Sequence, residues 1–183
     1  MAFKDNILTF EDTKITDTSS DIEVMMDWES GIMEKSAEFV CHNNGDVLEI
    51  GFGMGICADY IQAQGVNSHT IIEIHPQILE RLNTWASDKS NVTVIEGDWS
   101  SISLSDTYDG IFIDTFGDDN WFDFKDFALS RAKSGAKITY WNNFTDKRNE
   151  HNFNSVSFDD ISVTPDDNGY FSANTYNMPK VEL

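Results

Sequence analysis

Nine residues decide the fold of this chain: Val47-Leu48-Glu49-Ile50-Gly51-Phe52-Gly53-Met54-Gly55. An apolar strand runs into alternating glycines, which predicts a strand that ends in a tight turn and continues as a helix from about Ile56. Glycine lets the backbone adopt positive φ and lets a ligand approach the main chain, while the first amides of the helix point at that ligand. The segment therefore predicts a site for a nucleotide-like cofactor.

The glycine spacing separates two classes of cofactor. A dinucleotide site prefers G-x-G-x-x-G, but here the third glycine comes one residue early and Ile56 stands where that motif has glycine. This spacing disfavours a nicotinamide-dependent dehydrogenase. The pattern E-x-G-x-G-x-G instead resembles motif I of the class I S-adenosylmethionine-dependent methyltransferases, whose loop holds the methionine end of the cofactor. The resemblance assigns cofactor contacts to Glu49, Gly51, Gly53, Met54 and Gly55.

The composition indicates one folded domain with a strongly acidic surface. With 183 residues and 40% hydrophobic content, the chain can build one core, and we expect a single domain over residues 1–183. Its 32 acidic and 12 basic residues give a net charge of −20. This charge disfavours nucleic-acid and membrane partners and makes a small cationic substrate plausible, although solubility or adaptation to a salty environment explains most of the charge.

Other features of the sequence bear on metal binding and on cellular location. Cys41 and Cys57 have neither metal-ligand nor disulfide-scaffold spacing, so no metal site is expected. The first residues contain no apolar signal-peptide core and no apolar run approaches membrane-spanning length, so we expect a cytoplasmic location. The sequence does not indicate the oligomeric state.

Strand and helix patterns alternate along the chain. Residues 1–22 are polar and are expected to form a partly ordered arm, whereas residues 24–41 show helical spacing. The remaining elements are strands at 46–50, 68–74, 91–95, 108–115 and 136–141, helices at 56–63, 76–85 and 121–132, and two closing antiparallel strands at 160–164 and 175–181. This order predicts an α/β, Rossmann-like fold with a mostly parallel seven-stranded sheet and helices on both faces.

Acidic residues follow several of the predicted strands, at the edge where such sheets bind ligands. Glu73 lies one βαβ step after the glycine loop and is expected to accept the ribose hydroxyls of a nucleoside. Gly97 precedes Asp98 and Trp99, which are expected near the exocyclic amine and the face of an adenine. Asp114 ends an apolar strand, where a carboxylate is costly to bury unless it meets a cation, so it is the best candidate for contact with the methyl acceptor.

A longer resemblance spans most of the chain from Val24. The segment Val24-Met25-Met26-Asp27-Trp28-Glu29-Ser30-Gly31-Ile32-Met33 is similar to V-M-x-x-W-E-T-P-x-M of guanidinoacetate N-methyltransferases. The similarity continues through the glycine loop and through Ile71-Ile72-Glu73, Gly97-Asp98-Trp99, Ile113-Asp114-Thr115-Phe116 and Thr139-Tyr140-Trp141-Asn142.

This resemblance implies roles for two carboxylates. The helix pattern alone favours a position for Glu29 at the rim of its helix, but the family uses the W-E glutamate and the strand-end aspartate to hold a guanidinium. Glu29 and Asp114 thereby become the expected catalytic and substrate-binding residues, with Asp114 as proton acceptor. Two carboxylates suit the paired N–H donors of a guanidinium. Met25 and Met33 are expected near the cofactor, although ordinary helix packing explains them equally well.

The segments expected to enclose the substrate match the family less well than the segments expected to bind the cofactor. The resemblance implies that the main-chain amides of Asn143 and Phe144 receive the substrate carboxylate. Gly31 and Gly117 stand where the family has proline, and the segment after the last parallel strand is shorter.

Three functions remain open from the sequence. The leading hypothesis is an S-adenosylmethionine-dependent N-methyltransferase that acts on a guanidino group, with guanidinoacetate, which becomes creatine, as first candidate. Methylation of arginine, free or in a protein, is the second, because the same region resembles one class of arginine N-methyltransferases. The third is an S-adenosylmethionine-binding protein without activity, which the presence of both carboxylates disfavours.

Overall fold

The structure, a computed structural model, describes residues 3–183. The strands are β1 Leu8–Phe10, β2 Lys14–Asp17, β3 Ile22–Met26, β4 Asp46–Ile50, β5 Ser68–Glu73, β6 Val92–Glu96, β7 Tyr108–Ile113, β8 Ala132–Tyr140, β9 Ser157–Ser162 and β10 Thr175–Glu182. The helices are α1 Ser30–Val40, α2 Ile56–Ala63, α3 Pro76–Ala86 and α4 Phe124–Arg131, with short 3-10 turns η1 Phe3–Asp5, η2 Asp27–Glu29 and η3 Trp121–Asp123.

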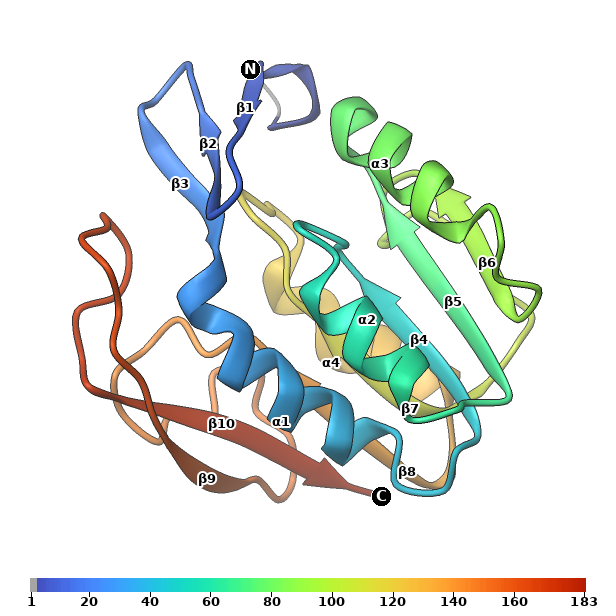
Figure 1. The fold of residues 1–183 in the computed structure, drawn as a ribbon. Coiled ribbons are helices and arrows are strands. Elements are labelled where there is room, and N and C mark those ends of the chain that lie inside the picture. The colour runs from blue at the N-terminus through green and yellow to red at the C-terminus, as the bar shows by residue number, and fades with distance from the viewer. Residues whose placement is uncertain (1–2) are drawn as a thin grey trace.

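A seven-stranded sheet in the order β6-β5-β4-β7-β8-β10-β9 forms the centre of the molecule (Figure 1). The strands from β4 to β8 pair in parallel, whereas β10 runs antiparallel to both β8 and β9. The predicted Rossmann-like fold with an antiparallel closing pair is confirmed. Because the chain moves outward from β4 in one direction and then resumes at β7 on its other side, a crevice is expected at the carboxyl ends of these two strands.

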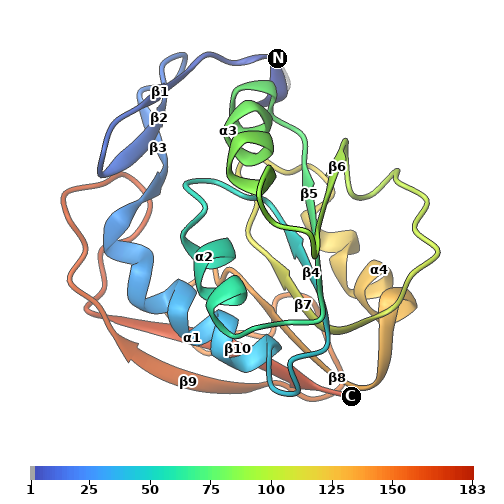
Figure 2. The ribbon, with the colours of Figure 1, turned by 45° about the vertical axis from the view of Figure 1, so that its right-hand side comes forward.

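Successive side chains of β4 face opposite layers of helices. Val47 packs in a core with α1 and α2, whereas Leu48 and Ile50 pack with Phe124 and Ala128 of α4. Figure 2 shows α4 on the opposite side of the sheet from α1 and α2, so the prediction of helices on both faces is confirmed. Within residues 3–183, none of the helices has the length and apolar character needed to cross a bilayer.

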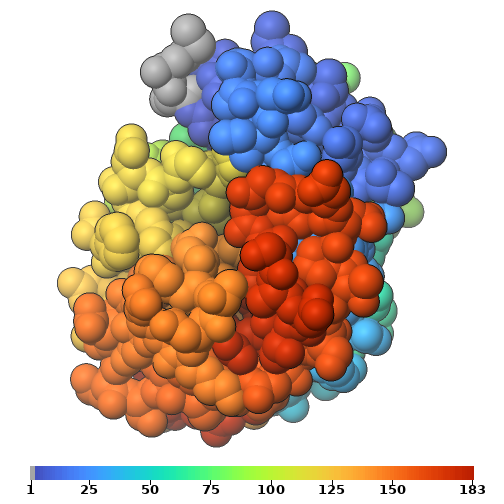
Figure 3. Space-filling model, turned by 90° about the vertical axis from the view of Figure 1, so that its left-hand side faces the viewer, coloured from blue at the N-terminus to red at the C-terminus, as the bar shows by residue number. Residues whose placement is uncertain are grey.

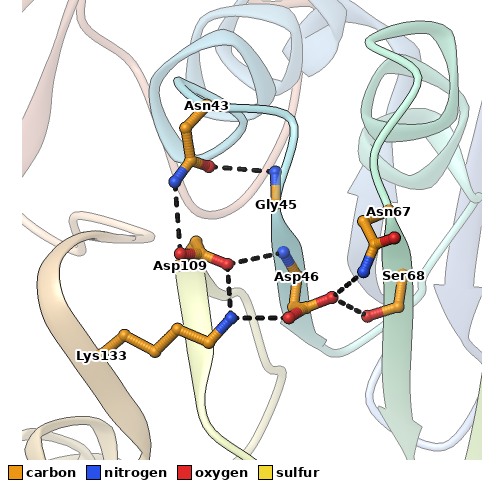
Figure 4. A network of polar contacts seen from close by, with 7 residues as sticks. All are labelled: Asn43, Gly45, Asp46, Asn67, Ser68, Asp109 and Lys133. Atoms are coloured by element: carbon orange, nitrogen blue, oxygen red, sulfur yellow. Dashed lines mark hydrogen bonds and ion pairs between the residues drawn. The ribbon is translucent and has the colours of Figure 1, made fainter.

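A polar network joins the strands at their amino ends (Figure 4). The Nζ atom of Lys133 donates to Asp46 at 2.6 Å and to Asp109 at 2.7 Å, and Asp109 also accepts the main-chain N–H of Asp46. Asp46 in turn accepts the hydroxyl of Ser68 at 2.7 Å. The network ties β4, β5, β7 and β8 together at the edge opposite the crevice, where it can stabilise the sheet without entering a ligand site.

The N-terminal segment forms a small antiparallel sheet, so the prediction of a partly ordered arm over residues 1–22 is wrong for its described part; residues 1–2 lie outside the description. Strands β1, β2 and β3 pair in that order, and Leu8 and Ile15 are buried in a cluster with α3. Gln77 exchanges two hydrogen bonds with the main chain of Leu8. Such short strands, each with few buried side chains, leave little periodicity in a sequence.

The helix predicted over residues 24–41 begins later, at Ser30. Met26 still pairs with β2, and its main-chain N–H donates to the carboxylate of Glu29 at 2.8 Å. This hydrogen bond fixes a 3-10 turn between strand and helix. Glu29 therefore lies in a turn and points inward, with 3% of its surface exposed, rather than at the rim of a helix.

Candidate active site

Two adjoining cavities occupy the crevice at the carboxyl ends of β4, β5 and β7. Gly51 and Glu73 line both of them. The first cavity, of about 60 Å³, is also lined by Met25, Met33, Glu49, Gly53 and Asp114. The second, of about 250 Å³, is also lined by Gly97, Asp98, Trp99 and Asp118. The structure thus gathers most of the predicted site residues around one continuous crevice.

The glycine loop needs its glycines for steric reasons. Gly51 has φ 89°, and a Cβ atom there would overlap the carbonyl oxygen of Asp114. Gly53 has φ 55°, and a Cβ atom there would lie 2.5 Å from the sulfur of Met25. The loop can therefore pass between β7 and the N-terminal sheet only without side chains at these positions.

Of the methionines and Gly55, all predicted to contact the cofactor, some line the first cavity and others do not. Met25 and Met33 line the first cavity, and the sulfur of Met25 accepts the main-chain N–H of Met54 at 3.2 Å. Met54 and Gly55 line neither cavity: Met54 borders a separate surface groove, and Gly55 is the N-cap residue just before α2. Their predicted cofactor contacts therefore have no geometric support here, because the loop turns away from the crevice after Gly53.

Glu49 presents an unpaired oxygen beside the first cavity. Its side chain is fully buried, and its Oε2 atom lies 2.8 Å from Nε2 of His69, whose Nδ1 atom is 3.2 Å from the amide of Gln62. The Oε1 atom has no hydrogen-bond partner among the described residues. Burial raises the pKa of Glu49, while His69 opposes that rise. His69 was not among the predicted site residues, because its only signal in the sequence is a polar side chain inside an apolar strand.

Glu73 organises the junction of the two cavities. Its carboxylate accepts three main-chain N–H groups, from Phe52 at 2.9 Å and from Ile74 and His75 at 2.8 Å each. It therefore holds the glycine loop against the end of β5. An ionised carboxylate has about four acceptor sites, so at least one remains for a ribose hydroxyl.

The second cavity has a fixed aromatic wall. The indole N–H of Trp99 donates to Asp118 at 2.7 Å, and Asp118 also accepts the hydroxyl of Thr115 at 2.8 Å. Asp98 accepts the main-chain N–H of Ser100 at 2.9 Å. These contacts hold Trp99 in one orientation, as a stacking surface for an adenine requires. Asp118 is a further residue of this cavity and was not among the predicted site residues.

Phe3 closes both cavities from the N-terminal side. It lines each of them, and its ring centroid lies 4.9 Å from that of His75 and 5.0 Å from that of Phe116. An isolated aromatic residue in a polar segment was the only sequence signal. The N-terminal segment is thus part of the site.

Glu29 and Asp114 form the acidic pair that the resemblance implied. Asp114 lines the first cavity at the end of β7, and Glu29 lies buried behind it in the turn before α1. Burial, and then the charge of Asp114, raise the pKa of Glu29 to about 8. Burial, and then the charge of Glu49, raise the pKa of Asp114 to about 7. The two carboxyls therefore retain a proton near neutral pH unless a cation joins them.

Asn143 and Phe144 line neither of the two cavities of the crevice. The amide of Phe144 donates to the side chain of Asn142 at 2.9 Å, and the amide of Asn143 lies 3.5 Å from the carboxylate of Glu150. These amides are occupied, and Glu150 adds negative charge beside them. Their predicted contact with a substrate carboxylate thus needs a rearrangement of this segment.

Proteins of known family resemble this chain in sequence. The model of the family described as guanidinoacetate N-methyltransferase matches residues 2–169. Protein arginine N-methyltransferase 2 of Yarrowia lipolytica is 37% identical over 137 residues, which are 68% of this chain and 28% of that protein. Its namesake from Saccharomyces cerevisiae is 35% identical over 147 residues, 72% of this chain and 35% of that protein. The chain thus spans about a third of the length of these relatives.

Solved structures resemble the chain in fold. Spermidine synthase from Thermotoga maritima superposes with a TM-score of 0.69 at 13% identity, covering 96% of this chain and 72% of that one. The N-methyltransferase NodS from Bradyrhizobium japonicum superposes with a TM-score of 0.63, also at 13% identity, covering 85% of this chain and 96% of that one. At such identities the likeness concerns the fold alone.

Proposed function

This chain belongs to the guanidinoacetate N-methyltransferase family, and we propose that it transfers a methyl group from S-adenosylmethionine to a nitrogen of a guanidino group. One observation carries the proposal: two carboxyls, Glu29 and Asp114, lie together beside the glycine-loop cavity, and no lysine or arginine is among the described residues that line this cavity. Buried acids without a protein cation are costly. A cationic acceptor supplies the missing charge.

The crevice fits S-adenosylmethionine. The second cavity offers Trp99 to an adenine, Glu73 stands where a ribose bridges the cavities, and the first cavity follows the glycine loop. There the unpaired, buried Oε1 atom of Glu49 suits an ammonium group. When bound, this cofactor supplies a methyl group activated by a sulfonium and leaves as S-adenosylhomocysteine.

The residues of the chain orient the acceptor and receive its proton. Glu29 and Asp114 accept N–H groups of the guanidinium and fix one nitrogen toward the methyl group, and such positioning supplies much of the acceleration. In this arrangement the C–N bond would form as the C–S bond of the cofactor breaks, the sulfur would leave with the electron pair, and the nitrogen proton would pass to Asp114. Since the pKa of Asp114 is raised to about 7, this carboxylate is a suitable base near neutral pH.

Guanidinoacetate is the first candidate acceptor, because it is the substrate that names the family. An arginine side chain is the second candidate, and two observations favour it. The main-chain amides expected to bind the guanidinoacetate carboxylate are occupied beside Glu150. The relatives in sequence are named arginine N-methyltransferases. The net charge of −20 is compatible with either cationic acceptor and disfavours nucleic acids and anionic membranes.

Methyl transfer from labelled S-adenosylmethionine tests the proposal. The panel contains guanidinoacetate, free arginine, an arginine-containing peptide and other guanidino compounds, with glycine as an amine that lacks the guanidino group. We expect turnover on at least one guanidino compound and none on glycine. Cofactor binding without turnover on any guanidino compound would refute the proposed activity and favour a binding protein.

A further inference from the structure

A tyrosine far away in the sequence holds the carboxylate of Glu29. The hydroxyl of Tyr170, in the loop between β9 and β10, donates to Oε1 of Glu29 at 2.6 Å. The same oxygen accepts the main-chain N–H of Met26 at 2.8 Å. Within residues 3–183, the other oxygen, Oε2, makes no hydrogen bond. One side of the carboxylate is thus fixed and the other is available.

The loop that carries Tyr170 is itself held in place. The side-chain oxygen of Asn168 accepts the main-chain N–H groups of Tyr170 at 2.9 Å and of Phe171 at 2.7 Å. The rings of Tyr170 and Phe171 stack on Trp28, with centroid distances of 5.9 Å and 5.6 Å. Phe171 is only 6% exposed. In Figure 3 this red C-terminal segment meets the blue N-terminal segment on one face of the molecule. The hydrogen bonds to Asn168 and the packing of these rings therefore hold the hydroxyl of Tyr170 in position.

We propose that Tyr170 is a positioning residue of the acceptor site, which holds Oε1 of Glu29 so that Oε2 faces the guanidinium. The inference rests on the proposed function of Glu29. A glutamate carboxylate turns easily about its last torsion, and a directed hydrogen bond removes that freedom before the acceptor arrives. The hydrogen bond also favours the ionised carboxylate, which is the form that binds a cation.

The substitution Tyr170→Phe keeps the stacked ring and removes the hydroxyl. With an acceptor that the unsubstituted chain methylates, we expect kcat/KM to fall roughly 10- to 100-fold, as for the loss of a hydrogen bond to a charged group. The hydrogen bond from Tyr170 lowers the pKa of Glu29 against the effect of burial. Its loss should therefore move the acidic limb of the kcat/KM profile to higher pH. Affinity for S-adenosylmethionine, measured by calorimetry, should not change.

A matched control is Tyr60→Phe. Tyr60 shares a hydrogen bond of 3.0 Å with Ser30, the residue next to Glu29, but makes none with Glu29 itself. We expect its pH profile to match that of the unsubstituted chain. Asn168→Ala keeps the Tyr170 hydroxyl but releases the loop, and it should shift the profile in the same direction by a smaller amount.

The outcomes separate the inference from the proposed function. If the unsubstituted chain methylates a guanidino compound and Tyr170→Phe leaves its kcat/KM and pH profile unchanged, the positioning role is wrong and the function stands. A fall in kcat/KM without movement of the acidic limb also refutes positioning and indicates a structural role. If Tyr170→Phe does not fold, an unaltered pH profile in Asn168→Ala refutes the inference. If no guanidino compound is methylated, both proposals fall.

Discussion

The substitution Asp114→Asn should abolish most activity and yet stabilise the ligand-free protein. The amide keeps the shape of the side chain but cannot receive a proton at neutral pH. A general base contributes about 10²- to 10⁴-fold to a proton transfer, so we expect kcat to fall by that range. Cofactor affinity should change little.

The stability change follows from the raised pKa. Burial raises the pKa of Asp114 from 3.8 to about 7, which corresponds to about 4 kcal/mol of destabilisation when the group is ionised. Asp114 is only partly buried, and solvent reduces this to about 2 kcal/mol. A raised carboxyl pKa favours the folded state below pH 3.8, and the advantage is lost as pH rises toward 7. The variant should therefore exceed the unsubstituted chain in stability at pH 8 and match it near pH 4.

Thermal and urea unfolding of the ligand-free protein measure this difference. A gain of about 2 kcal/mol in a domain of this size corresponds to about 4–8 °C in Tm. The control is Asp109→Asn, at the opposite edge of the sheet (Figure 4). Burial acts to raise the pKa of Asp109, but hydrogen bonds led by that from Lys133 outweigh it and lower the pKa. This control should lose stability at pH 8. If Asp114→Asn also loses stability at pH 8, the ionised Asp114 does not destabilise the ligand-free fold. If the variant keeps full activity, Asp114 is not the general base.

Two further substitutions test the cofactor crevice. Glu73→Ala leaves three main-chain N–H groups without their acceptor and should weaken S-adenosylmethionine binding roughly 10- to 100-fold; an unchanged calorimetric Kd contradicts the ribose assignment. Phe3→Ala opens both cavities and should weaken binding roughly 5- to 20-fold through lost apolar contact, whereas equal affinity in fluorescence titration shows that the N-terminal segment does not cover the cofactor.

The central sheet was predictable because its strands are buried on both faces. Segments rich in apolar residues, such as 47–50 and 108–113, are recognisable as strands in the sequence even though they contain Glu49 and Asp109, and each is followed by a turn and a helix. The α2 helix, Ile56–Ala63, has the predicted bounds. By contrast, β1 to β3 bury few side chains each, and their stability comes from contacts with α3. The spacing of apolar residues within each short strand does not reveal these contacts with α3.

The candidate site was predictable where it depends on strand ends and was missed where it depends on long-range contacts. Asp114 and Glu73 follow directly from the rule that ligands bind at the carboxyl edge. Glu29 was predicted as a site residue only from the family resemblance, since the helix pattern alone predicted a position at the rim of the helix. Tyr170 meets Glu29 across 141 residues, and Phe3 meets the crevice only through the folded N-terminal sheet. Neither contact has a sequence spacing that could reveal it.

The charges around the first cavity connect binding to release. Glu49, Glu73 and Asp114 line it, Glu29 lies behind them, and no lysine or arginine is among its described lining residues. Under the proposed function, each cation that enters would stabilise the cavity: an ammonium at Glu49 and a guanidinium at Glu29 and Asp114. In the proposed reaction, methyl transfer would remove the positive charge of the sulfonium and would place a proton on Asp114. A protonated Asp114 would attract the methylated guanidinium less strongly than the ionised carboxylate attracted the reactant, so the same proton transfer that completes the reaction would favour release of the product.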